Sequence, residues 1–439
     1  MKMRRIVAFL LAVALSASVF SGCSQNSATP SSPATGGGTS AASAAENVTI
    51  KVACWDKATM PEFQTAVDAF DAKNPNIKIE LVDKPSSEYT NNLSIMLNGG
   101  SDLDAFWIKD ADTTLAMQKK GQLADLTDYI KKDNVDLSQY NGLAKNFEFD
   151  GKTYGLPFRT DYYVLYYNKD LFDAAKVAYP TNDMTWDDFE AMAKKLTSGQ
   201  GADKKYGGFI HSWQACVENW GVQDGKHTIL DTDSNYDFFK PYYEMALRMQ
   251  KNGTIMKYSE IKSGNIHYSS PFMKGQVAML PMGTWFMSTL IAKTKSGENK
   301  ANWAVATLPH PKGVKAGYTV GSATPLVINQ ASSKKDAAWQ FAKFVTGEDG
   351  AGAISKIGSM PGISNATTLG NIAAVEGMPK NLLEALNVTN ITPDRPIAEK
   401  VSEVNKMLGE QHDMIMLGES TIDQGLAEMT KQSKEIQGK

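Results

Sequence analysis

The chain is poor in the residues that build metal centres and disulfide frameworks. Its 439 residues include 3 cysteines and 5 histidines, and none of them has the C-x-x-C or H-E-x-x-H spacing of a metal site. There is no G-x-S-x-G nucleophile motif, no G-x-x-x-x-G-K phosphate loop and no G-x-G-x-x-G after the first predicted strand. We therefore predict no metal, no cofactor and no catalytic residues.

Strong charge of one sign and long apolar runs are also missing. The 45 basic and 48 acidic residues give a formal net charge of −3, without a block of Lys or Arg. Such a chain is unsuited to nucleic acid and to electrostatic binding of a membrane surface. After the N-terminal segment, no uninterrupted apolar stretch reaches the roughly 18 residues of a membrane helix. We expect a folded body with no nucleic-acid partner.

The N-terminus has the organisation of an export signal. Three basic residues within the first five precede an apolar run over residues 6–20, and Ser21-Gly22-Cys23 follows. The tripeptide resembles the lipobox of bacterial lipoproteins, although Phe20 stands where that motif usually has leucine. The resemblance implies that residues 1–22 are removed and that Cys23 receives a diacylglyceryl group. An ordinary secreted protein with an incidental Cys23 is the alternative.

A tether is expected between this cysteine and the folded body. Residues 23–47 are mostly Ser, Ala, Gly, Thr, Pro and Asn, which bury too little apolar surface to offset the entropy of ordering. Loss of the signal removes Lys2, Arg4 and Arg5 and changes the formal net charge from −3 to −6. The predicted location is the extracellular face of the bacterial cytoplasmic membrane, held by the lipid anchor only.

Alternating strand and helix patterns begin at residue 48. Residues 48–54, 77–81 and 103–108 have strand patterns, and residues 61–70 and 93–97 have helical spacing between them. This order predicts right-handed βαβ units with a parallel sheet. Ligands of such sheets bind beyond the carboxyl ends of the strands.

The rest of the chain continues as an α/β protein. A body of nearly 400 residues exceeds the usual size of one domain, so two lobes are expected. Further helices are predicted at 186–196, 242–249, 335–346 and 421–436, and further strands at 207–210, 277–280, 303–308 and 325–328.

A series of short motifs then occurs in a characteristic order. Residues 154–157 read YGLP and residues 165–172 read LYYNKDLF. They are followed by TWDDF at 185–189, GQVAM at 275–279, GTW at 283–285 and AWQFAKFVTGEDG at 338–350. In order and spacing, the chain resembles the extracellular solute-binding proteins of bacterial carbohydrate ABC transporters, over essentially the whole mature sequence.

The resemblance implies a periplasmic-binding-protein-like fold. Each of two lobes would have a central sheet flanked by helices, and a hinge would join them. Lobe one would comprise residues 48–160 plus 302–350, and lobe two residues 161–301 plus 351–439. Cys54 and Cys216 would then lie on different lobes, where a disulfide would clamp the lobes together; two unbridged cysteines are the alternative.

The implied function is capture of a mono- or oligosaccharide. A monomer would close on the sugar and deliver it to permease subunits driven by a cytoplasmic ATPase. An anchored carbohydrate-active enzyme, such as a glycosidase, would use a similar aromatic cleft. A receptor of the same fold for a non-sugar solute, or a sensor co-receptor, is the third possibility.

Sugars present hydroxyls to carboxylates and amides, and C–H faces to aromatic rings. Trp285 is the leading candidate, since by resemblance it lies on the cleft wall and stacks on a pyranose; a core tryptophan is the alternative. The loops after the first and third strands contribute Trp55, Asp56 and Lys57, then Asp110 and Asp112. Maltodextrin-binding relatives have an arginine where this chain has Ala111, which makes maltodextrin a poorer candidate.

The remaining candidates lie in lobe two or at the crossing between lobes. Arg159 and Asp161 follow the YGLP motif, where they could bind ligand or form a hinge salt bridge. His211 and Trp213 follow a predicted strand, although a lone histidine is more often structural. Met360 belongs to a segment that resembles a late cleft loop of the family.

Overall fold

The computed structural model describes residues 47–100, 102–109 and 111–439. The predicted signal peptide, the lipidation site at Cys23 and the tether up to residue 46 lie outside the described residues, as does Asp110. The described residues from 47 onward belong to one compact unit. Within its described part, no helix is long and apolar enough to cross a membrane.

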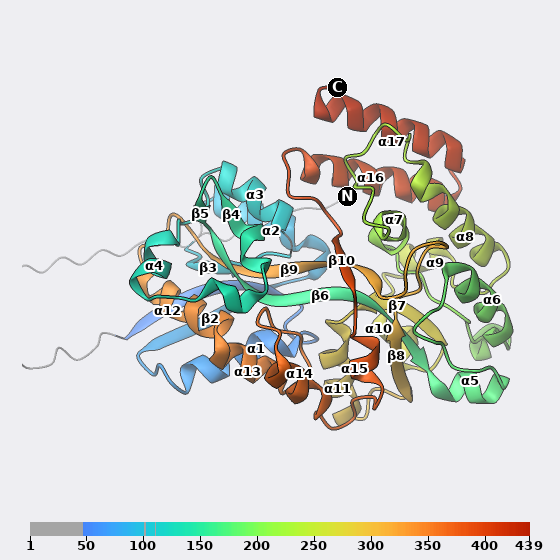
Figure 1. Ribbon diagram of the computed structural model, residues 1–439, viewed down its shortest axis with the longest axis horizontal. Coiled ribbons are helices and arrows are strands. Elements are labelled where there is room, and N and C mark those ends of the chain that lie inside the picture. Colours follow the sequence, from blue (N-terminus) through green and yellow to red (C-terminus); the bar gives the residue numbers. More distant parts are fainter. Residues whose placement is uncertain (1–46, 101, 110) are drawn as a thin grey trace, which may run out of the picture. The chain divides into compact units, whose positions relative to one another are not determined.

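One mixed sheet runs through the body (Figure 1). Its strand order is β2-β1-β3-β9-β6-β7, with β10 beside β9 and β8 beside β6, and β4 and β5 form a separate pair. The strands are β1 (Val48–Trp55), β2 (Ile77–Lys84), β3 (Ala105–Trp107), β4 (Glu148–Phe149), β5 (Lys152–Thr153), β6 (Gly155–Asn168), β7 (Met279–Gly283), β8 (Trp303–Thr307), β9 (Tyr318–Ile328) and β10 (Asn390–Pro393).

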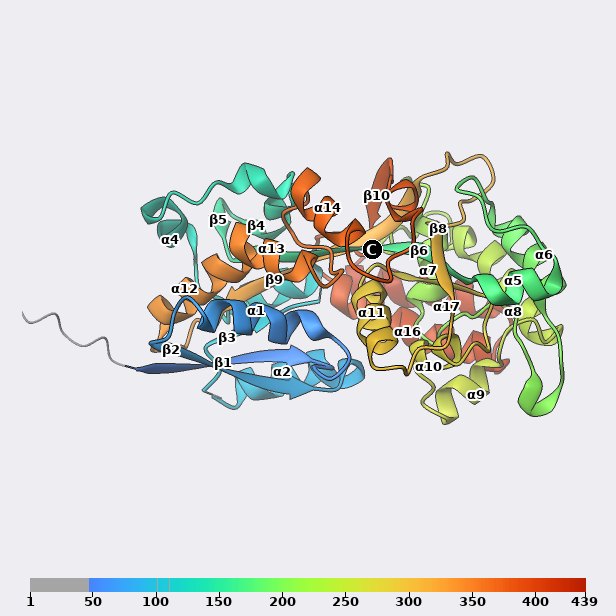
Figure 2. The same ribbon diagram turned by 90° about the horizontal axis from the view of Figure 1, so that it is seen from below.

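Helices pack against both halves of this sheet (Figures 1 and 2). They are α1 (Pro61–Asp71), α2 (Tyr89–Asn98), α3 (Ala111–Lys119), α4 (Thr127–Lys132), α5 (Lys169–Ala175), α6 (Trp186–Leu196), α7 (Ala215–Val222), α8 (Lys240–Lys251), α9 (Tyr258–Ser263), α10 (Ser269–Met273), α11 (Phe286–Lys295), α12 (Lys335–Thr346), α13 (Glu348–Ser355), α14 (Ala366–Ala373), α15 (Leu382–Ala385), α16 (Val401–Leu417) and α17 (Ile422–Gln437).

The predicted βαβ units are confirmed at the start of the body. β1 pairs in parallel with both β2 and β3, and α1 and α2 connect these strands. The sheet is not parallel throughout, because β9 joins β3 in the antiparallel sense and β6 joins β9 in the same way. The two long strands β6 and β9 therefore connect the parallel half to the rest of the sheet.

The two largest hydrophobic cores lie on either side of the middle of β6. The first core includes Phe63, Trp107 and Phe341, and the second core includes Tyr166 and Trp220. β6 contributes Leu156 and Phe158 to the first core, and its residues from Tyr162 onward belong to the second. Two cores joined by shared strands are the basis of a two-lobed body.

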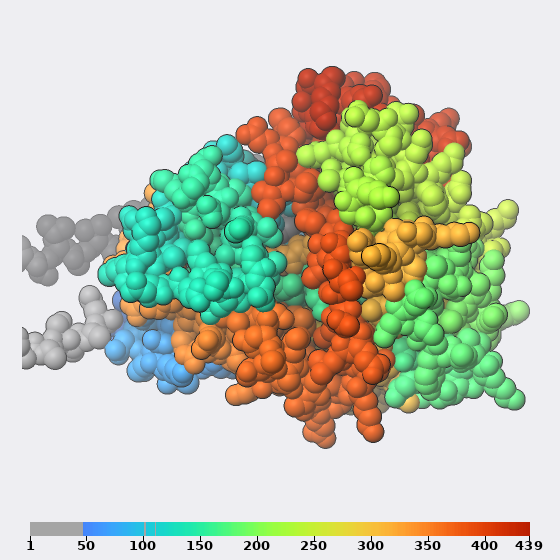
Figure 3. Space-filling model, in the orientation of Figure 1, coloured from blue at the N-terminus to red at the C-terminus, as the bar shows by residue number. Residues whose placement is uncertain are grey.

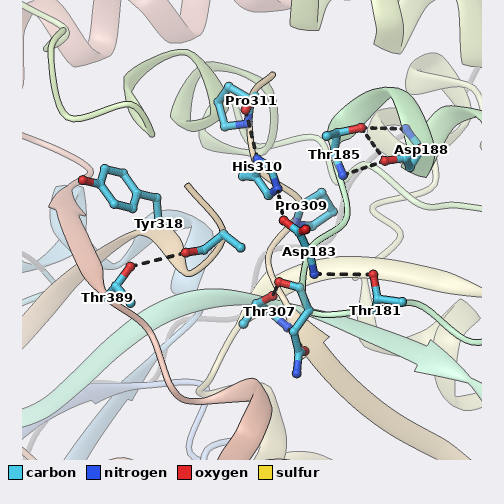
Figure 4. Close-up of polar contacts among 12 residues, drawn as sticks. Thr181, Asp183, Thr185, Asp188, Thr307, Pro309, His310, Pro311, Tyr318 and Thr389 are labelled. Atoms are coloured by element: carbon cyan, nitrogen blue, oxygen red, sulfur yellow. Dashed lines mark hydrogen bonds and ion pairs between the residues drawn. The ribbon is translucent and has the colours of Figure 1, made fainter. Parts of the chain in front are cut away.

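The segment before β9 packs with the second core. Residues 303–306 and 308 are members of it, whereas Leu326, Val327 and Ile328 belong to the first core. Polar contacts support the same attachment: Thr307 Oγ1 donates to the carbonyl of Asn182, and His310 Nε2 lies 3.1 Å from Asp183 Oδ1 (Figure 4). The lobe boundaries given by the sequence remain a proposal.

The strand predicted at residues 207–210 is wrong, because Gly207 presses against the end of α6 and Gly208 N–H donates to the carbonyl of Thr254. These contacts take the backbone away from a continuous ladder.

Cys54 and Cys216 are both buried and unbridged, and burial raises the pKa of each thiol to about 12.

Candidate functional site

A cavity of about 480 Å³ lies within the folded body. Its wall includes Trp55 and Met60 from the first core and Tyr163 and Tyr268 from the second. The volume falls within the roughly 300–1,000 Å³ range of small-molecule sites. A ligand held there would touch residues of both cores.

One side of the cavity is an aromatic wall built by the second core. Trp285 Nε1 donates to the hydroxyl oxygen of Tyr268 at 3.0 Å, and its ring meets Tyr163 edge-on with centroids 5.5 Å apart. Trp213 lies against Tyr268 at 5.6 Å in a similar edge arrangement. Trp285 is half-buried and packs against both cores. It therefore combines structural contacts with a place on the cavity wall.

The opposite side carries Trp55 at the end of β1. Its ring lies 5.0 Å from both Phe63 and Tyr89, and the side chain is only 5% exposed. Lys109 Nζ is 5.5 Å from the centroid of this ring. Trp55 is thus mainly a core residue that also lines the cavity.

Asp56 follows Trp55 and shapes the loop after β1. Its φ of 47° places the backbone in the left-handed region, which aspartate tolerates better than most residues. Asp56 Oδ1 accepts from the backbone N–H of Ser86 at 2.9 Å, and the Asp56 carbonyl accepts from Thr59 N–H and Met60 N–H. The loop holds the carboxylate at the cavity wall.

A buried ionic cluster forms where β6 passes between the cores. Pro157 faces Pro325 in the ladder, and the register shifts between Pro157 and Arg159. A bulge next to two prolines fits, because neither proline has an N–H to donate. Arg159 and Asp161, two residues apart, then place their side chains on the same side of the strand.

Arg159 contacts two carboxylates at once. Its Nε lies 2.8 Å from Asp161 Oδ2, and its Nη1 contacts Glu62 at the start of α1. All three side chains are at most 4% exposed. Burial raises the pKa of both Glu62 and Asp161, and the Arg159 guanidinium opposes that rise without cancelling it.

The cluster also touches the helix that follows Trp285. Ser288 Oγ is 3.5 Å from Glu62 Oε2, and Thr284 Oγ1 is 3.3 Å from Asp161 Oδ1. Thr289 Oγ1 donates to the carbonyl of Thr59 at 2.7 Å, which joins α11 to the turn before α1 (Figure 2). The Arg159–Asp161 salt bridge considered from the sequence is therefore present, and both residues also line the cavity.

Sequence reasoning missed Arg395, a cationic residue of the cavity wall. The guanidinium N–H groups donate to neutral oxygens. Nε donates to Asn405 Oδ1, and Nη1 donates to Asn219 Oδ1 at 3.1 Å and to the Asp394 carbonyl at 2.6 Å. Among the described residues, no carboxylate oxygen lies within 4.0 Å of it. Within the described part of the chain, the hydrogen bonds of the guanidinium come from Nε and Nη1.

Arg395 reaches the cavity through a long-range pairing. β10 lies beside β9 in parallel register, with Pro393 opposite Gly321, and Arg395 follows two residues later. The segment that carries β10 is the orange-red strip down the face shown in Figure 3. No local pattern marks this residue, because its position depends on two strands more than 60 residues apart.

Six of the predicted residues come together at the cavity. They are Trp55, Asp56, Arg159, Asp161, Trp213 and Trp285. Asp110 lies outside the described residues. As ligand contacts, all the residues named from the sequence stay predictions.

Four others lie away from the cavity wall. Lys57 is exposed, and Asp112 is buried in α3, where it accepts from Ser402 Oγ at 3.3 Å. Met360 is 2% exposed, and its carbonyl accepts from Thr160 N–H. His211 is buried, and its ring centroid lies 4.6 Å from that of Trp213.

The buried histidine is held neutral. Burial, followed by the nearby His267, lowers the pKa of His211 to about 3. A neutral imidazole at physiological pH supports packing rather than charge pairing. In the described part of the chain, no group of three or more His, Cys, Asp or Glu side chains is placed to hold a metal ion.

The chain matches the family of bacterial extracellular solute-binding proteins over residues 56–352, and it belongs to that family. It is 25% identical over 325 residues to a lactose-binding protein of Rhizobium radiobacter, covering 68% of this chain and 71% of the relative.

Solved structures of similar proteins share the fold. A sugar transporter of Rhizobium etli in an open conformation superimposes with a TM-score of 0.72 at 41% identity, covering 88% of this chain and 99% of that one. An ABC substrate-binding protein of Listeria monocytogenes in complex with cycloalternan gives 0.75 at 25% identity, over 90% and 100%. The predicted two-lobed periplasmic-binding-protein-like fold is confirmed.

Proposed function

We propose that this protein captures a mono- or oligosaccharide in the cavity and delivers it to an ABC permease for import. The observation that carries the proposal is the composition of the wall: aromatic rings and charged side chains from both cores face one volume. Aromatic faces suit the C–H side of a sugar ring, and carboxylate and guanidinium groups suit its hydroxyls. The names of the similar proteins, lactose-binding protein and sugar transporter, support the same class of ligand.

The charged residues of the wall would make different kinds of hydrogen bond to the sugar. Asp56 and Asp161 would accept hydrogen bonds from sugar hydroxyls, and Arg395 would donate its Nη2 hydrogens to sugar oxygens. Trp285 and Trp213 would stack on ring faces. Asp110 remains a proposed contact from the sequence.

The role is binding without chemistry. Asp161 is shared with Arg159, and the neighbouring acid Glu62 is fully buried, so neither is arranged as the exposed carboxylate pair of a glycosidase. We propose that the mature chain is a monomer anchored through Cys23 outside the cytoplasmic membrane. Its partners would be permease subunits driven by a cytoplasmic ATPase.

Titration calorimetry against a saccharide panel tests this function. Lactose, maltose, mannobiose, arabinotriose, cycloalternan and mannitol form the panel, and phosphate and amino acids serve as non-sugar controls. We expect one-to-one binding of at least one saccharide and its intact recovery by chromatography. Cleaved sugar would favour the anchored enzyme, and binding of only the controls would favour a non-sugar receptor.

A further inference from the structure

Trp285 is held over a glycine two residues earlier in the chain. Gly283 is the last residue of β7 and pairs with Tyr163 of β6. The chain then turns at Thr284, whose N–H donates to the Tyr162 carbonyl at 2.9 Å. This turn folds the indole of Trp285 back onto Gly283.

The contact is too close for any side chain at position 283. A Cβ added to Gly283 would lie 1.9 Å from Cζ3 of Trp285 and 2.2 Å from both Cε3 and Cη2, where ordinary contact begins at 3.4 Å. These three ring atoms are consecutive and almost equally close, so the added carbon would lie over the face of the ring. One face of the indole therefore rests on the glycine backbone.

Two buried tyrosines of the second core pack beside the indole. Trp285 Nε1 donates to Tyr268, which is 4% exposed, and the rings of Trp285 and Tyr163, also 4% exposed, meet at 80° with centroids 5.5 Å apart. Both tyrosines belong to the second core. Because Trp285 also lines the cavity, we expect a methyl group at position 283 to push the ring toward the space that a ligand needs.

We propose that Gly283 is a positioning residue for ligand binding. By having no side chain, it sets how far the Trp285 ring projects into the cavity, and Tyr268 fixes the rotation of that ring. The proposal rests on the proposed function, and it adds a residue that touches no ligand itself. It predicts that changes at Gly283 alter affinity through Trp285 alone.

A double-mutant cycle tests this dependence, with the panel saccharide that the wild type binds most tightly as the probe. We expect Gly283→Ala to weaken binding on the order of tenfold, because the displaced ring obstructs the ligand. In a Trp285→Ala background, the same Gly283→Ala change should leave the remaining affinity nearly unchanged, since no ring is left to displace. Gly370→Ala is the matched control, because an added Cβ there meets nothing within 4 Å.

Tyr268→Phe provides a second route that adds no volume. It removes the hydrogen bond to Trp285 Nε1, and it should weaken binding in the wild type but not in the Trp285→Ala background. A Gly283→Ala effect of equal size in both backgrounds, or none in the wild type, would overturn the proposal while sugar binding stands. A wild type that binds no saccharide would instead remove the proposed function.

Discussion

At the scale of single residues, tryptophans of this protein differ in whether they line the cavity or lie wholly within a core. Trp285 packs against both cores and also lines the cavity, whereas Trp220 is 1% exposed and lies wholly within the second core. Removal of Trp285 and removal of Trp220 are therefore expected to cost different amounts of unfolding free energy. This difference also provides a control within the same protein.

Trp285→Ala should weaken saccharide binding by on the order of 2 kcal/mol, roughly thirtyfold in affinity, as for a typical aromatic hot spot. Its loss of unfolding free energy should be smaller than that of Trp220→Ala, which leaves a full cavity at a cost of about 3–5 kcal/mol. Calorimetry and ligand-free denaturation measure the two quantities. Equal destabilisation by both changes, with unaltered affinity, would make Trp285 a core residue only.

Glu218 gives the molecule a pH dependence of its own. Burial raises the pKa of this carboxyl to about 7, and Tyr243 donates to its Oε1 at 3.0 Å. Because the folded protein holds the proton more tightly than the unfolded chain, the stabilisation is complete below the ordinary pKa of 4.5 and is lost as the pH rises to about 7.

Glu218→Gln should remove this dependence. Between about pH 4.5 and 7, the free energy of unfolding of the wild type should fall relative to that of the variant by on the order of 3 kcal/mol. Urea denaturation across this range measures the difference. Glu399→Gln, at a surface side chain that is 72% exposed, should keep the wild-type profile. A Glu218→Gln profile parallel to the wild type would contradict the assignment.

At the scale of elements, helix α6 shows how a local sequence fixes a boundary. Thr185 Oγ1 accepts from Asp188 N–H at 3.2 Å, and the Asp188 carboxylate accepts from Thr185 N–H at 3.0 Å (Figure 4). This capping box satisfies backbone donors that the first turn leaves unpaired. The T-W-D-D-F motif therefore has a structural explanation that needs no ligand.

Thr185→Ala should lower the free energy of unfolding by about 1 kcal/mol, since it removes the cap. Thr185→Ser keeps the hydroxyl and should stay close to the wild type. Saccharide affinity should not change in either variant, because the cap does not line the cavity. Urea denaturation measures the stability, and a parallel calorimetric titration measures the affinity. An unchanged stability of Thr185→Ala, or a changed affinity of either variant, would contradict this account.

Elements with strong periodicity were predictable from the sequence, and those fixed by distant contacts were not. Helix α12 has the bounds that its pattern predicts, and β1 extends its predicted strand by one residue, because each has a clear apolar face. Arg395 and Tyr268 had no such signal, since strand pairing with β9 and packing beside Trp285 bring them to the cavity. The strand predicted at residues 207–210 failed because periodicity cannot show that a glycine backbone presses on α6.

At the scale of the whole molecule, the proposed anchor decides where the body works. Cys23→Ala should release the native protein from membrane fractions into the soluble fraction, because a diacylated cysteine is the only membrane attachment that we propose. Detergent phase partitioning followed by immunoblotting measures the distribution. Equal solubility of the two forms would contradict the lipoprotein proposal and leave the binding site unaffected.

The two cores are joined by shared strands, and we expect the body to close by movement of one core toward the other. A ligand that touches both sides of the cavity stabilises the arrangement in which both sides are close, through its differential affinity for that state. The buried Glu62–Arg159–Asp161 cluster and the Thr289–Thr59 hydrogen bond lie beside the cavity, so such a movement would change their geometry.

A crystal structure of the protein grown with its tightest panel saccharide tests the central claim most directly. We expect electron density for one intact sugar in the 480 Å³ cavity, with a ring face on Trp285 and oxygens within hydrogen-bond distance of Arg395 and of Asp56 or Asp161. A sugar bound at another site, or a cavity occupied by a solute without sugar hydroxyls, would contradict the account.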